Sequence, residues 1–274
     1  MSTPVPPREK LPTMYDLPSG DVAAYGSPDN FYVHPAILLQ ETFRPPVAPP
    51  DEVLSAIQLN LYYDPQRPRW CVQPSWFGVI GVPRLYEGQE RWNYQIWHDL
   101  VPPLIVLEFY SPRVKDDLLK KKPRSAHQQP TRWEIYEQIV RVPYYVVLDG
   151  DENTMRVFRL TDARYRETEG HDGRCWIPEA ELGLGLWRGK GYGDPGVWLR
   201  CYDARGDWIP SREDLAEQAR MDACRALVEA EHTRQIETQC RKTEQVEQLL
   251  KQERRRSERL AEALRRLGQD PDKP

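Results

Sequence analysis

A single carboxylate interrupts an apolar segment near the middle of this 274-residue chain. Glu108 stands within residues 104–110, and the nearly continuous apolar character of this segment predicts a strand buried on both faces. An ionised carboxylate is costly in such a strand unless it binds a cation, forms an ion pair or takes up a proton. Glu108 is therefore a candidate functional residue, and a structural ion pair between Glu108 and an arginine is the alternative.

Cysteine and histidine do not define a second site. The five cysteines form no Cys-x-x-Cys pair, and no histidine stands at the spacing of zinc ligands, so we predict reduced thiols rather than zinc or disulfides. The five histidines are equally scattered. No local Cys–His or Ser–His pattern is present, although catalytic triads can assemble in space from distant residues.

Strand and helix patterns surround Glu108. Apolar runs predict strands at residues 59–63, 77–82, 104–110 and 144–148. Residues 133–140 repeat apolar side chains at helical spacing, which gives a strand–helix–strand unit with a helix covering the sheet. Shorter segments at 155–160, 165–168 and 200–202 indicate an antiparallel extension. The predicted fold class is α/β (α+β), with a mixed sheet.

The first fifth of the chain has its own composition. Residues 1–50 are rich in proline, which favours an extended N-terminal arm lying on the domain; a proline-rich ligand for another protein is the alternative. Residues 51–58 predict a short helix, because Asp51 and Glu52 follow Pro50 and acidic residues suit the positive end of a helix dipole.

The last quarter of the chain predicts one long helix. All 28 aromatic residues precede position 211, and residues 211–267 contain neither proline nor glycine. A heptad pattern of apolar residues favours a dimeric coiled coil, with a solvated single helix as the alternative. The pattern is good near the C-terminus but passes through charged residues in its middle. We expect an arm at 1–50, a core at 51–210, the helix at 211–268 and a tail at 269–274.

Charge and hydropathy limit the functional classes. Residues 1–210 carry 24 Lys and Arg against 28 Asp and Glu, and residues 211–274 carry 14 against 14, so neither part holds nucleic acid by its net charge alone. The chain contains no apolar run of membrane-spanning length and no apolar N-terminal leader. We expect a cytoplasmic protein.

Short motifs along most of the chain carry a family resemblance. Glu108 is followed by Ser111 and Pro112 in a Glu-x-x-Ser-Pro pattern. Further matching segments are residues 12–18, 59–64, 81–86, 131–138 and 182–187, together with the charged C-terminal helix. This set resembles the Uma2 family of restriction endonucleases in the PD-(D/E)XK superfamily. The resemblance implies a restriction-endonuclease-like fold.

The resemblance also implies Mg²⁺-dependent hydrolysis of phosphodiester bonds in DNA. In that chemistry two carboxylates hold the metal ion and a nearby lysine orients the attacking water. Glu108 matches the family glutamate, which makes it the expected metal ligand. The expected aspartate position after Pro74 holds Ser75, and the expected lysine position, four residues before Tyr136, holds Arg132.

These two departures weaken the expected metal site. Ser75 is neutral, so Mg²⁺ should bind more weakly, and Arg132 keeps its charge but cannot act as a base. Arg132 is able to clamp a phosphate or to form an internal ion pair with Glu108. A replacement carboxylate could come from Asp116, Asp117 or Asp149, with solvated loop acids as the alternative. The basic residues Lys120, Lys121, Lys122 and Arg124 are the candidate DNA contacts, or form a solvated loop.

Two functional hypotheses follow. The first is a Mg²⁺-dependent DNA endonuclease that acts as a homodimer and whose active site is degraded. The second is an inactive pseudonuclease that binds DNA or protein and assembles through its coiled coil.

Overall fold

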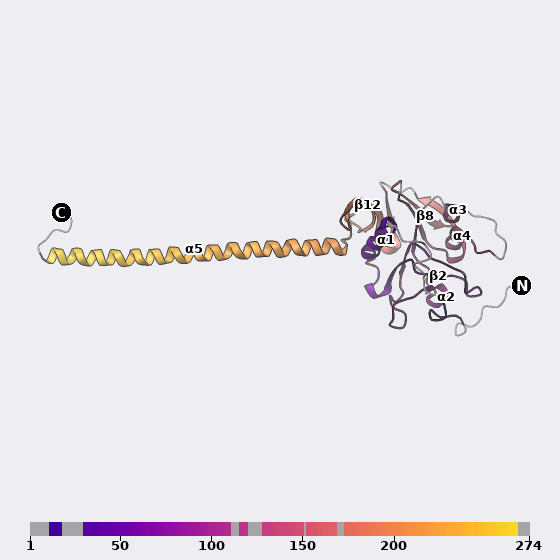
Figure 1. Ribbon diagram of the computed structural model, residues 1–274, viewed down its shortest axis with the longest axis horizontal. Coiled ribbons are helices and arrows are strands. Elements are labelled where there is room, and N and C mark those ends of the chain that lie inside the picture. Colours follow the sequence, from indigo (N-terminus) through magenta and orange to yellow (C-terminus); the bar gives the residue numbers. More distant parts are fainter. Residues whose placement is uncertain are drawn as a thin grey trace. The chain divides into compact units, whose positions relative to one another are not determined.

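The structure of the chain is a computed structural model (Figure 1). It describes residues 11–17, 30–110, 115–119, 128–150, 152–168 and 173–267. The chain divides into two compact units, Met1–Glu213 and Asp214–Pro274, which are described separately below.

A six-stranded mixed sheet forms the centre of the first unit. Its strand order is β1-β4-β6-β7-β8-β9. The strands are β1 (Val53–Ile57), β4 (Trp76–Ile80), β6 (Ile105–Phe109), β7 (Tyr144–Asp149), β8 (Thr154–Thr161) and β9 (Arg164–Thr168). Only the central pair of this sheet, β6 and β7, is parallel. The predicted mixed α+β class is confirmed.

Side-chain alternation along β6 separates two cores. Val106 packs on one face with residues of the crossover helices, whereas Ile105 and Leu107 pack on the other face. Because successive residues of a strand point to opposite faces, Glu108 shares the face of Val106. The carboxylate therefore points toward the helices that connect β6 to β7.

The connection from β6 to β7 carries three short helical segments: α3 (Lys115–Leu119), α4 (Arg132–Glu134) and the π-helix η4 (Ile135–Val140). Parallel neighbours require such a crossover. The helix predicted at 133–140 is present, with the last six residues in π geometry. A capping box at Thr131 and Glu134 fixes its first turn.

Two small sheets complete the first unit. The order β3-β2-β5 joins β3 (Cys71–Val72), β2 (Leu61–Tyr62) and β5 (Tyr94–Gln95), and the helix α2 (Ile96–Asp99) follows β5. The order β10-β11-β12 joins β10 (Arg174–Ile177), β11 (Leu182–Gly191) and β12 (Asp194–Tyr202), with the 3-10 turn η5 (Pro178–Ala180) after β10. The predicted strand pieces at 59–63 and 200–202 belong to these sheets.

Two expectations about the N-terminal quarter are wrong. Residues 53–57 form β1 rather than a helix, since only Pro50–Glu52 (η3) makes a single 3-10 turn before the chain pairs with β4. Within the expected arm, Asn30–Thr42 forms the helix α1, in which Ala36, Leu38 and Leu39 are buried. Burial of these apolar side chains outweighs the cost of Pro35 inside the helix.

The second unit consists mainly of the long helix α5 (Arg212–Arg266), as the sequence predicts. Leu227, Val246, Leu250 and Leu260 are all more than half exposed on this helix. The coiled coil remains a prediction.

Candidate active site

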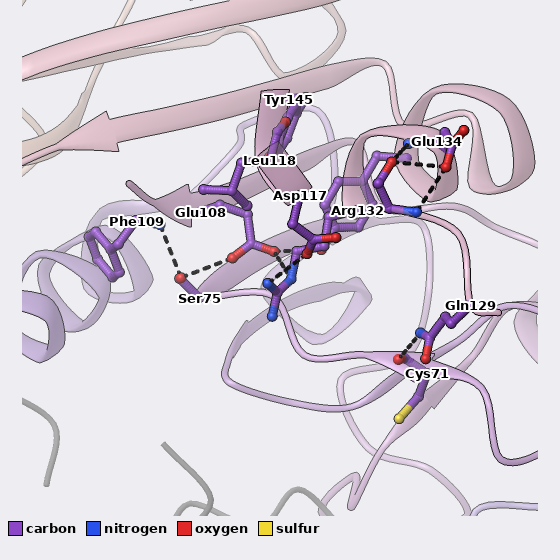
Figure 2. A network of polar contacts seen from close by, with 12 residues as sticks. Cys71, Ser75, Glu108, Phe109, Asp117, Leu118, Gln129, Arg132, Glu134 and Tyr145 are labelled. Carbon is purple, nitrogen blue, oxygen red and sulfur yellow. Dashed lines mark hydrogen bonds and ion pairs between the residues drawn. The ribbon is translucent and has the colours of Figure 1, made fainter. Parts of the chain in front are cut away.

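Three separate segments bring the predicted site residues together (Figure 2). Ser75 immediately precedes β4, Glu108 lies on β6, and Arg132 is the first residue of α4. The Ser75 hydroxyl donates a hydrogen bond of 3.2 Å to Oε2 of Glu108. The Nε atom of Arg132 lies 3.1 Å from Oε1 of the same carboxylate. The ion pair between Glu108 and an arginine, anticipated from the sequence, is confirmed.

Glu108 is a buried carboxylate with partners on both oxygens. Glu108 is only 4 % exposed. Oε1 also accepts a 2.7 Å hydrogen bond from the hydroxyl of Tyr136. Burial raises the pKa of Glu108 above its ordinary value, while Arg132, Tyr136 and Ser75 oppose that rise by favouring the charged form. Desolvation is the largest of these effects.

Ser75 bonds both to the carboxylate and to the backbone. While its hydroxyl donates to Glu108, the same oxygen accepts a hydrogen bond of 3.2 Å from the backbone N–H of Phe109. An ionised aspartate at this position could still accept the bond from Phe109, but it would place a second negative charge beside Glu108. Two carboxylates so close together require a shared cation or a proton.

Arg132 contacts two carboxylates at once. Besides its ion pair with Glu108, its Nη1 atom lies 3.1 Å from Oδ2 of Asp117 on α3 (Figure 2). The Arg132 side chain is 15 % exposed. The capping box of Thr131 fixes the backbone directly before Arg132, because Thr131 N–H donates to Oε2 of Glu134 at 2.9 Å. A largely buried guanidinium therefore compensates the charge of the site.

Tyr136 is a site residue whose role the sequence did not reveal. It stands one helical turn after Arg132, at the start of the π-helix, and is fully buried. Burial, followed by the neighbouring Glu108 charge, raises the pKa of Tyr136 well above its ordinary value, so the phenol stays protonated and donates. The four-residue spacing of Arg132 and Tyr136 was the available signal, since it places both side chains on one helix face.

The donor set of this site does not fit Mg²⁺. Magnesium prefers octahedral oxygen coordination that includes carboxylates. Here Glu108 and Asp117 are joined by a guanidinium, and the position of the second expected carboxylate holds the neutral hydroxyl of Ser75. Among the described residues, no group of three or more His, Cys, Asp and Glu side chains is arranged to hold a metal ion.

The other residues predicted for the site either lie elsewhere in the fold or are not among the residues that the structure describes. Asp149 ends β7 and accepts a hydrogen bond from the N–H of Glu152 at 3.2 Å. The side chain of Asp116 is not described, and neither are the four basic residues proposed for DNA contact, Lys120, Lys121, Lys122 and Arg124.

The fold and the site together define a class. A mixed sheet that carries a buried glutamate on one of its central parallel strands, facing a crossover helix, is a restriction-endonuclease-like arrangement. A family model described as "Uma2: Putative restriction endonuclease" matches residues 8–190. The chain belongs to the Uma2 family, and its PD-(D/E)XK superfamily membership follows from that.

One further comparison and one property of the helices complete this description. No curated protein matches the chain. Among the described residues, none of the helices combines the length and the apolar character needed to cross a membrane.

Proposed function

We propose that this chain is a DNA endonuclease of the Uma2 type whose hydrolytic activity is impaired by its own side chains. The observation that supports the proposal most directly is the position of Arg132 between Glu108 and Asp117. A divalent cation in a nuclease site of this class would neutralise nearby carboxylates. In this chain the guanidinium of Arg132 already lies against both carboxylates and offsets one of their two negative charges.

Electrostatics explains why the impairment should be severe. The Glu108 charge is offset by Arg132 at 3.1 Å, so the attraction for a metal ion is weaker than at a carboxylate pair without a cation. Arg132 also cannot give up its proton at neutral pH, so it cannot serve as the base that activates water. Replacing Ser75 with aspartate would restore the expected pair of carboxylates with Glu108, and replacing Arg132 with lysine would provide a smaller cation.

Plasmid cleavage tests the proposal. We would compare the wild type with Glu108→Ala, Ser75→Asp/Arg132→Lys and Ser75→Asn/Arg132→Lys, each in Mg²⁺, in Mn²⁺ and in EDTA. The asparagine variant is the matched control, because asparagine has nearly the size of aspartate without its charge. Thermal shift with Mg²⁺ alone reports metal binding independently of cleavage.

The expected result is cleavage by the Ser75→Asp/Arg132→Lys protein only, accompanied by a rise in its melting temperature with Mg²⁺. Efficient metal-dependent cleavage by the wild type that disappears in Glu108→Ala would show that the site is intact and would refute impairment. If no variant cuts DNA or binds Mg²⁺, the idea that this cluster derives from a metal-dependent nuclease site is refuted.

A second candidate function is a scaffold that assembles through α5. Apolar side chains exposed along the C-terminal half of this helix support it, with Val246, Leu250 and Leu260 in one heptad register. Light scattering should give a dimer for the wild type and a monomer for Leu250→Glu/Leu260→Glu. The control Gln248→Glu/Gln252→Glu adds the same charge away from these leucines and should remain dimeric. A monomeric wild type would exclude this assembly.

A further inference from the structure

The strand β1 forms one edge of the six-stranded sheet, and its outer side can be assigned residue by residue. Next to its ends, Gln58 N–H donates to the Ser75 carbonyl, and Gly81 N–H donates to the Glu52 carbonyl. Hydrogen-bonded pairs alternate along an antiparallel ladder, so even-numbered residues of β1 bond to β4. The backbone groups of Val53, Ser55 and Ile57 therefore point away from the sheet.

Most of these outward groups have no partner among the described residues. The side chain of Gln40 donates to the Ser55 carbonyl at 2.9 Å. Within the described part of the chain, no hydrogen bond is found for the N–H groups of Val53, Ser55 and Ile57 or for the carbonyls of Val53 and Ile57. Such an edge is a template for another extended chain, which proteins usually block.

A groove of about 890 Å³ runs along this edge, and all five residues of β1 line it. The proline-rich segment that follows α1 contributes Phe43, Pro45 and Pro46, and Leu85 adds to the apolar lining. A strand of five residues is about 17 Å long. The groove thus offers backbone pairing and apolar contact over the length of a short extended peptide.

Arginine side chains give the groove its charge preference. Arg44 and Arg84 line it, are exposed, and have no ion pair with any described residue. Arg91 also lines it but is held by Asp99, at 2.8 Å and 3.0 Å. Glu90 is the only acidic residue in the lining. Two available cations beside one carboxylate favour an acidic ligand.

We propose that the β1 edge binds an extended acidic segment of a partner protein, which adds a strand to the sheet. The peptide pairs with Val53, Ser55 and Ile57 and places acidic side chains near Arg44 and Arg84. A nucleic acid would also suit the arginines, but it has no alternating backbone N–H and C=O groups to match the edge of a strand. The observations therefore favour a peptide.

A displayed library of random ten-residue peptides is the probe, selected against the full chain. The most enriched peptide is then synthesised with a fluorescein label, and its affinity is measured by anisotropy. Ser55→Pro removes an outward N–H without touching a bond to β4, and proline is tolerated on edge strands. Ser55→Ala is its matched control, because both variants lose the hydrogen bond from Trp76 Nε1 to the Ser55 hydroxyl.

The expected outcome is a set of enriched peptides with acidic residues at alternating positions. Binding should weaken about tenfold or more in Ser55→Pro and stay unchanged in Ser55→Ala. Arg44→Glu/Arg84→Glu, which changes only exposed side chains, should weaken it as well and decides the matter if Ser55→Pro does not fold.

Three results would overturn the proposal. The first is a selection that yields no shared acidic pattern. The second is peptide binding that survives both Ser55→Pro and the charge reversal. The third is a labelled DNA duplex that binds in the peptide's place and depends on Arg44 and Arg84.

Discussion

Removing the guanidinium of Arg132 should leave a buried charge without its main compensation. For two unit charges 3.1 Å apart, an effective dielectric constant near 20 gives about 5 kcal/mol of attraction. Loss of one partner from a buried pair typically costs about 3–5 kcal/mol. Because Tyr136 and Ser75 still donate to Glu108, we expect Arg132→Met to lower the free energy of unfolding by about 3 kcal/mol at pH 8.

The pH dependence provides a check on the cause. Burial already raises the pKa of Glu108 above its ordinary value of 4.5, so the folded protein binds a proton there more readily than the unfolded chain does. Stability from this group is therefore highest at low pH and falls as the pH rises from about 4.5 through the folded pKa. Without Arg132 that pKa rises further, so the deficit of Arg132→Met should shrink between pH 8 and pH 5.

Urea denaturation followed by tryptophan fluorescence is the appropriate assay, because all nine tryptophans precede residue 211 and report the core alone. Arg69→Met, at an exposed position, is the control and should change stability by less than about 0.5 kcal/mol. Glu108→Gln/Arg132→Met should be more stable than the sum of its single substitutions predicts. A loss below about 1 kcal/mol, or one equal at both pH values, would refute the reasoning.

Three further predictions concern stability and use the same denaturation assay. Tyr136→Phe removes the 2.7 Å bond to Glu108 and should cost about 1.5–3 kcal/mol, and a neutral result would mean that this bond does not stabilise the carboxylate. Thr131→Ala breaks the capping box before Arg132 and should cost about 1 kcal/mol, whereas Thr131→Ser should cost less. Gly183→Ala places a methyl group against the ring of Tyr202 and should cost about 1–3 kcal/mol, and an unchanged free energy of unfolding would contradict this packing.

The strands were predicted best where burial on both faces left a continuous apolar run. The runs at 104–110 and 144–148 became β6 and β7, whose pairing is parallel. The error at 51–58 arose because Asp51 and Glu52 are a local helix signal, whereas the pairing of β1 with β4 depends on residues 19 to 27 positions away. The abundance of proline likewise obscured α1, which is stabilised by the burial of its apolar residues.

The site was predictable only as far as family motifs and charge could indicate. The motif positions led to Ser75, Glu108 and Arg132, and the structure places Ser75 within hydrogen-bond distance and Arg132 within ion-pair distance of Glu108. The bond from Tyr136 and the contact of Arg132 with Asp117 depend on how the crossover packs over the sheet. No spacing in the sequence fixes that packing. Asp117 could therefore be named only as one of three candidate carboxylates, together with Asp116 and Asp149.

The parallel pair β6 and β7 constrains the order in which the site can assemble during folding. Ser75 and Arg132 reach Glu108 from segments 33 residues before it and 24 residues after it, so neither of these two contacts is local in sequence. Closing such loops costs entropy before any contact compensates for it. We therefore expect the Glu108 carboxylate to meet its cation late in folding, after the sheet has paired. Substitutions at Arg132 should mainly accelerate unfolding and leave the refolding rate almost unchanged.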